Sequence, residues 1–169
     1  MKINVSAVFL LISIFGRTQN SPKYSLESNV LGTRQSIVHS LSLQISYNKL
    51  LFELALGYEL GRAVQYRYLS PNLMLGFGHQ LMQQKKMDLF LKSSFLRQWR
   101  QFPSNKSLVS NGLYFGYSYV YGRRIKFIQS LQLGILHNQA ASGLSIVTHD
   151  FLISFGVRYL FQKNNILEK

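Results

Sequence analysis

The sequence contains no cysteine, only three prolines and only six acidic residues among its 169 residues. Without cysteine it can form neither a disulfide framework nor a thiolate metal site, and it cannot carry a lipid on an N-terminal cysteine. Three prolines are too few for a proline-rich linker protein. No apolar run reaches the roughly 20 residues that a transmembrane helix needs.

Apolar, aromatic and basic residues are abundant. Hydrophobic residues make up 47% of the chain, with 12 phenylalanines and 10 tyrosines, which excludes intrinsic disorder. The length predicts one domain. A net charge of +13 raises the question of nucleic acid, but the basic residues are scattered and form no recognised nucleic-acid motif. We therefore predict no nucleic-acid partner.

The first 20 residues have the order of a secretory signal peptide. Lys2 precedes an apolar run over 3–15, and small or polar residues follow over 16–20. We place the cleavage after Thr18, which predicts a signal peptide at 1–18, a folded domain at 19–161 and a short tail at 162–169. The alternative for this segment is a buried N-terminal strand or helix of a cytosolic protein.

Beyond residue 22 apolar residues alternate with small or polar ones, the pattern of β-strands. Leu41, Leu43 and Ile45, for example, alternate with serine and glutamine. Similar alternation recurs to give about eight strands: a weak one at 24–31, then 40–47, 50–60, 73–82, 87–99, 112–121, 126–135 and 151–161. Loops or turns are expected at 48–49, 61–70, 83–86, 101–109, 122–124 and 138–144.

These strands are longer than the usual 5 or 6 residues of soluble sheets and approach the roughly 9 to 11 of a membrane-spanning strand. Because all connections resemble hairpins, an open sheet would leave two exposed edges. The predicted fold class is therefore all-β, a closed antiparallel up-and-down barrel of about eight strands.

The alternation alone does not say which face points outward. A soluble periplasmic ligand-binding barrel turns its apolar face inward, and a transmembrane barrel turns it toward lipid. The second face here is rich in Gly, Ser, Gln and Ala, which suits a narrow lumen better than a water-exposed surface. Aromatic residues near strand ends suit the two membrane interfaces; they are Tyr47, Tyr58, Trp99, Tyr119 and Tyr121. We predict a transmembrane barrel and keep the soluble one as an alternative.

The end of the last strand resembles the closing-strand signature of bacterial outer-membrane barrels. Its positions are filled by Ser154, Gly156, Tyr159 and Phe161. In that family the strand is read by the barrel-assembly machinery, although the signature usually ends the chain and here the tail 162–169 follows. In length and layout the whole chain resembles small eight-stranded outer-membrane barrels of Gram-negative bacteria, and Gln19 at the expected mature start is reminiscent of envelope proteins of the Bacteroidota.

On the predicted lumen face lie five charged residues: Glu53, Glu59, Lys92, Lys126 and Arg158. An eight-stranded barrel is just wide enough to be filled by its own side chains, so unpaired charges there would be costly. We expect both glutamates to pair with basic residues, and we exclude a general diffusion porin. The basic turn residues Lys85, Lys86, Arg123 and Arg124 are expected to meet lipid phosphates, and other basic residues to meet lipopolysaccharide.

We predict no catalytic residue, no metal and no cofactor. None of the four histidines has the spacing of a metal-ligand pair. The segment 137–144 loosely resembles that of lipid A deacylase barrels, but Gln139 stands where their nucleophilic serine would be and no glutamate follows before Glu168. Only a shifted pair of His137 with Ser142 would support a lipid-modifying hydrolase. The expected role is structural, adhesive or in an envelope complex, with residues 59–70 projecting as a hairpin toward a protein partner.

Overall fold

A computed structural model of the chain describes residues 22–60, 70–84, 86–101, 107–123 and 125–161. The expected signal peptide at 1–18, most of the expected hairpin at 59–70 and the tail at 162–169 lie outside these residues. No helix among the described residues is long and apolar enough to cross a membrane.

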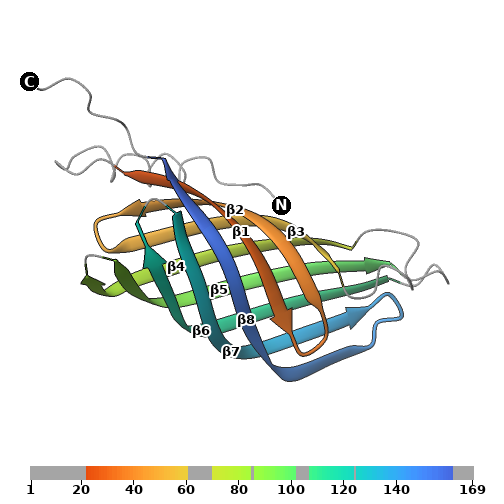
Figure 1. Cartoon of the computed structure of the whole chain (residues 1–169). Helices are drawn as coiled ribbons and strands as arrows, with labels where there is room; N and C mark the ends of the chain where they lie inside the picture. The colour runs from red at the N-terminus through yellow and green to blue at the C-terminus, as the bar shows by residue number, and fades with distance from the viewer. Residues whose placement is uncertain (1–21, 61–69, 85, 102–106, 124, 162–169) are drawn as a thin grey trace, which may run out of the picture.

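The chain folds into a closed barrel of eight antiparallel strands in meander order (Figure 1). The last strand pairs with the first, with Tyr24 opposite Phe161 at one end of the ladder and Thr33 opposite Leu152 at the other. This confirms the predicted fold class. The strands are β1 (Lys23–Thr33), β2 (Ile37–Tyr47), β3 (Leu50–Glu59), β4 (Pro71–Gln84), β5 (Met87–Gln101), β6 (Ser107–Gly122), β7 (Ile125–Ala140) and β8 (Ser145–Phe161).

Several strands are longer than the sequence predicted. Asn138 and Gln139, expected in a loop, belong to β7 and pair with Ile146 and Ser145 of β8. Likewise β4 continues to Gln84, past a register shift between Gln80 and Met82. These corrections share a cause: near the barrel ends both faces of a strand meet water or headgroups, so polarity no longer marks where a strand stops.

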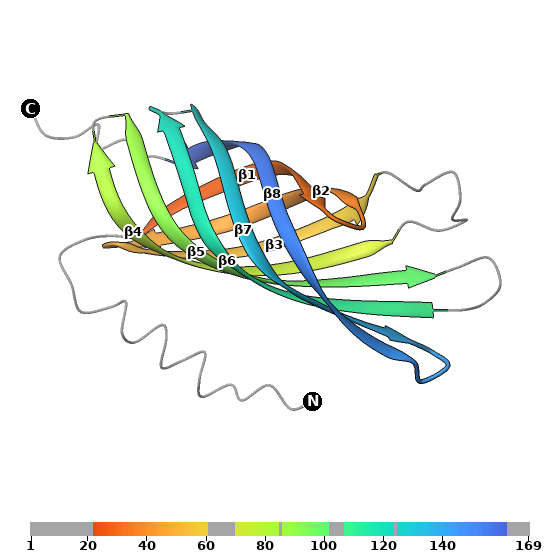
Figure 2. The ribbon, with the colours of Figure 1, turned by 90° about the horizontal axis from the view of Figure 1, so that it is seen from below.

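The connections divide the barrel into two unlike ends. One end, here called the turn end, carries the short β2–β3, β4–β5 and β6–β7 connections. The first residue of β1 and the last residue of β8 also lie there. The opposite end is called the loop end. The strands β5 to β8 have 15 to 17 residues and β1 to β3 have 10 or 11. Figure 2 shows the longer strands running past their neighbours toward the loop end.

The barrel is apolar outside and polar inside. Leu133 on the outer face is 69% exposed, whereas Gln44 on the inner face is fully buried. Leucine, phenylalanine and tyrosine dominate the exposed alternate positions, and serine, glutamine and paired charges the buried ones. A water-soluble barrel would show the reverse arrangement, so the apolar face is the lipid-facing one.

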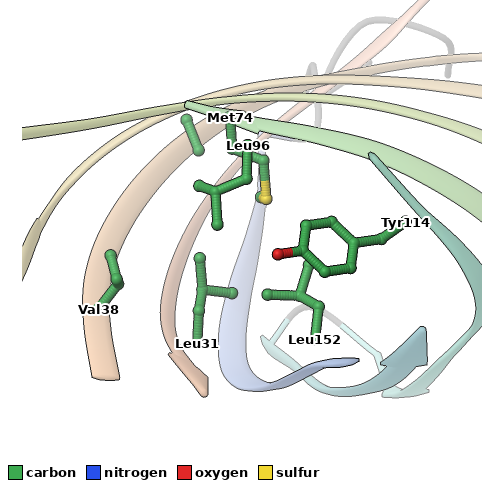
Figure 3. Packing of buried hydrophobic residues seen from close by; sticks show 7 residues of the cluster. Leu31, Val38, Met74, Leu96, Tyr114 and Leu152 are labelled. Atoms are coloured by element: carbon green, nitrogen blue, oxygen red, sulfur yellow. The ribbon is translucent and has the colours of Figure 1, made fainter. Parts of the chain in front are cut away.

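The interior is filled in layers, which the inner face of β5 follows from end to end. Asp88 lies nearest the turn end, followed by apolar Phe90, polar Lys92 and Ser94, and apolar Leu96, and then Gln98 and Arg100 at the loop end. Phe90 belongs to an apolar cluster with Leu51, Val120 and Ile128. Leu96 belongs to a larger one with Leu31, Val38, Ala55, Met74, Tyr114 and Leu152 (Figure 3). The cluster around Leu96 takes residues from seven of the eight strands and so crosses the polar interior, whereas the cluster around Phe90 occupies only the side formed by β3, β5, β6 and β7.

Candidate functional site: the barrel interior and its rims

The centre of the barrel holds an ion pair between Glu53 on β3 and Lys92 on β5. The two side chains are 0% and 5% exposed, so neither charge is hydrated by bulk water. The pair spans β4, where Gly76 stands opposite Glu53 in the register. Glu53 thus has the basic partner that we expected from the sequence, and that partner is Lys92.

A second buried pair joins Arg158 on β8 to Glu27 on β1, with 3.0 Å between Nε and Oε2. Glu27 also accepts hydrogen bonds from the amides of Asn29 and Gln44. Sequence reasoning placed Arg158 in the lumen but missed Glu27, because the first strand alternates only weakly. The alternation of Ser25, Glu27 and Asn29 on one face was the signal that could have found it.

At the turn end Lys126 on β7 pairs with Asp88 on β5, with 2.5 Å between Nζ and Oδ2. The other Asp88 oxygen accepts a hydrogen bond of 3.0 Å from the Gln80 amide. These residues line a cavity of about 410 Å³ at the mouth of the barrel. Phe90 and Arg158 also line this cavity, so it reaches both the apolar cluster around Phe90 and the buried pair of Arg158 with Glu27.

At the loop end Glu59 on β3 pairs with Arg100 on β5 at 3.0 Å. Arg100 also donates to the side-chain oxygens of Gln35 and Gln98, and Gln98 donates to Ser36 Oγ. The β1–β2 turn is thereby fastened across the lumen. Glu59 was expected to pair with a basic residue, but Arg100 had not been singled out as its partner.

Asp150 completes the interior polar groups at this end. It accepts a hydrogen bond of 2.8 Å from the Tyr114 hydroxyl and one of 2.9 Å from the backbone N–H of Arg34. Its neighbour His149 points to the opposite, exposed face, as expected for adjacent strand residues.

All five carboxylates among the described residues lie inside the barrel: Glu27, Glu53, Glu59, Asp88 and Asp150. Four of them pair with the cations described above, and Asp150 accepts hydrogen bonds from the Tyr114 hydroxyl and the backbone N–H of Arg34. The remaining described basic residues lie outside the lumen or at its rims: Lys23, Arg34, Lys49, Lys86, Arg97 and Arg123. The described outer surface is therefore purely cationic, which favours contact with anionic groups.

The predicted interfacial aromatics lie near the strand ends. Tyr58, Tyr119 and Tyr121 are exposed on the outer face, and Trp99 is half-buried beneath the Arg97 guanidinium, 5.1 Å from its ring centroid. Tyr47 departs from this expectation, because it is only 6% exposed. The alternation of burial breaks at the end of β2, where the chain enters a tight turn with Asn48 at φ 53°.

The four residues of the closing-strand signature lie on β8, the strand that seals the barrel against β1. Ser154 and Gly156 face inward, and Tyr159 and Phe161 face outward with their ring centroids 5.5 Å apart. Recognition of this strand by the assembly machinery stays a prediction.

A histidine–serine pair occurs on the outer face at the loop end, but not the one considered from the sequence. His137 Nε2 lies 2.5 Å from Ser145 Oγ, whereas Ser142 is in the β7–β8 turn. A hydrolytic triad needs a carboxylate to orient the histidine, and every described carboxylate faces the interior. No group of three or more histidines and carboxylates in the described ranges could hold a metal ion.

The fold defines a class of protein, the small eight-stranded membrane barrel. No family model and no curated protein matches this chain. It is similar to the N-terminal β-barrel domain of Pseudomonas aeruginosa OprF, with a TM-score of 0.58 and 9% identity over 82% of this chain and 97% of that one. It is also similar to Neisserial surface protein A (NspA), with a TM-score of 0.51 and 13% identity over 82% and 94%. At these identities the similarity shows the fold alone.

Proposed function

We propose that this chain is a non-enzymatic integral barrel of the Gram-negative outer membrane and that it anchors a protein-contact surface, used in adhesion or in an envelope complex. The fold shared with outer-membrane barrels and the apolar outer face support the location. The layered interior supports an anchor rather than a pore.

One observation carries the contact surface: a free strand edge on β8. β7 pairs with β8 as far as Gln139 opposite Ser145. β1, on the other side of β8, pairs with it only as far as Leu152. Residues 145–151 consequently have a partner strand on one side only. Edges of this kind are usually blocked by proline, lysine, a bulge or an inward-pointing charge. Residues 145–149 contain none of these, whereas Asp150 faces inward and binds the N–H of Phe151 at the end of the edge.

The pairing pattern identifies the backbone groups at this edge. The N–H of Phe151 donates to the side chain of the preceding residue, Asp150, and therefore does not bond to β7. The backbone groups of Phe151 point away from β7, toward the free edge. Because strand residues alternate, Val147 and His149 direct theirs to the same free edge. Val147 is 62% exposed. Unpaired backbone groups are not tolerated in hydrocarbon, which supports placing this edge outside the bilayer, on the side of the longer connections.

Fractionation of expressing cells tests the location. We expect the protein in the outer-membrane pellet, with an electrophoretic mobility that differs between unboiled and boiled samples because a closed barrel resists detergent. A soluble periplasmic protein without this difference would contradict the proposal and favour the ligand-binding barrel.

Photo-crosslinking in whole cells tests the surface. A photoreactive residue at His149 should give protein adducts, whereas the same residue at lipid-facing Leu131 should not. Val147→Pro should abolish the adducts at His149, because it removes one N–H of the free edge while sparing the β7 ladder. An absence of adducts at His149, or adducts unchanged by Val147→Pro, would refute the contact surface.

A further inference from the structure

A shallow groove of about 480 Å³ lies on the outer face of the barrel near the turn end. It crosses β6, β7 and β8 and is mainly aromatic. Its lining consists of Tyr119, Tyr121, Phe127, Ile128, Gln129, Phe155 and Gly156. Tyr119, Gln129 and Phe155 stand side by side in the register of the three strands, so Gln129 forms the middle of the groove.

Gln129 is out of place on a lipid-facing surface. On its own strand its outward neighbours are Phe127 and Leu131, which are 63% and 57% exposed. Its side chain makes no hydrogen bond with any other residue in the described part of the chain. An amide facing an apolar medium without a hydrogen-bond partner is costly, so this position requires a partner from outside the protein.

A positive charge lies at the neighbouring rim. Arg123 is exposed in the β6–β7 turn, two residues after Tyr121. No described carboxylate is available to it, since all of them face the lumen. These three features match the parts of a glycerophospholipid. The aromatic walls suit an acyl chain, the amide suits an ester carbonyl, and the guanidinium suits the phosphate.

We propose that this groove is a binding site for one anionic glycerophospholipid of the leaflet at the turn end. Arg123 at the rim binds the phosphate, the Gln129 amide donates to an ester carbonyl, and the acyl chain continues from there past Phe155 toward the middle of the barrel wall. The site presupposes the membrane location proposed above and adds a lipid specificity to it.

The site can be tested on purified, heat-modifiable protein by native mass spectrometry from detergent micelles supplied with phosphatidylglycerol or phosphatidylcholine. Wild-type protein should retain one phosphatidylglycerol in preference to phosphatidylcholine. Gln129→Leu should weaken this retention about fivefold, the usual effect of losing one hydrogen bond. Arg123→Gln should remove the preference for the anionic headgroup.

Gln139→Leu is the matched control, because Gln139 is an exposed glutamine on the same strand and face at the opposite end of the barrel. It should retain lipid like the wild type. Equal retention by the Gln129→Leu and Gln139→Leu proteins, or equal retention of the two lipids by the wild type, would overturn the site. Because only folded barrels enter the experiment, such a result would leave the proposed location standing.

Discussion

Glu53 and Lys92 pair across an intervening strand, and Gly76 on that strand makes the contact possible. A Cβ atom at Gly76 would lie 2.9 Å from Glu53 Oε2 and 3.3 Å from Lys92 Cε. The two long side chains therefore meet over a position that carries no side chain of its own. The small residues of the inner face, which look featureless in the sequence, create the space for the buried charges.

Replacing Glu53 by Gln should lower the thermal stability of the barrel. The substitution leaves the Lys92 ammonium buried without its counter-charge, and breaking a buried ion pair in this way costs about 3–5 kcal/mol. The temperature at which the unboiled gel band shifts to its boiled position measures the effect. An unchanged transition temperature would show that the pair contributes nothing.

The double variant Glu53→Gln with Lys92→Met separates the lost attraction from the stranded charge. Removing both charges should recover a large part of the stability lost in Glu53→Gln alone, because an apolar pair of similar size tolerates burial. If the double variant is as unstable as the single one, the loss is due to packing rather than to charge.

The alternation of residues predicted the barrel and its orientation, because period-two patterning and the chemistry of the two faces both depend on local sequence. Glu53, Lys92 and Arg158 were assigned to the interior for the same reason. Which residues pair was not accessible, since Arg158 meets Glu27 through the closure of the barrel, 131 positions away in the chain.

The strand ends and the outer rims were harder to predict. Asn138 looked like a loop residue because it is polar, yet it continues β7 beyond the apolar band. The contact of His137 with Ser145 likewise depends on the length of the β7–β8 turn, which the sequence does not define. Gln129 was passed over because a single amide among aromatics does not disturb the alternation.

Gly134→Ala should destabilise the barrel, whereas Gly32→Ala should be tolerated. A Cβ at Gly134 would collide with the backbone carbonyl of Leu113, while one at Gly32 would approach nothing closer than 3.9 Å. Forcing an extra carbon into a closely packed site costs about 1–3 kcal/mol. Heat-modifiability of the two variants checks this, and equal transition temperatures would contradict the close approach of β6 and β7.

The purified barrel should not conduct ions in planar bilayers. The apolar layer around Leu96 takes side chains from seven of the eight strands and crosses the polar interior, and narrow apolar constrictions exclude water and ions. Replacing Leu96 by serine should produce measurable openings if this layer is the barrier. Steady currents from the wild-type protein would refute the sealed interior.

Ser145 should not react with a fluorophosphonate probe, although it touches His137. An activated serine needs a base that is itself held and polarised by a third group. Here the described carboxylates all lie on the other side of the barrel wall. In-gel fluorescence of the wild type should therefore equal that of Ser145→Ala, with Ser142→Ala as a control for the turn serine. Labelling that disappears in both Ser145→Ala and His137→Ala would instead establish a hydrolase at the loop end.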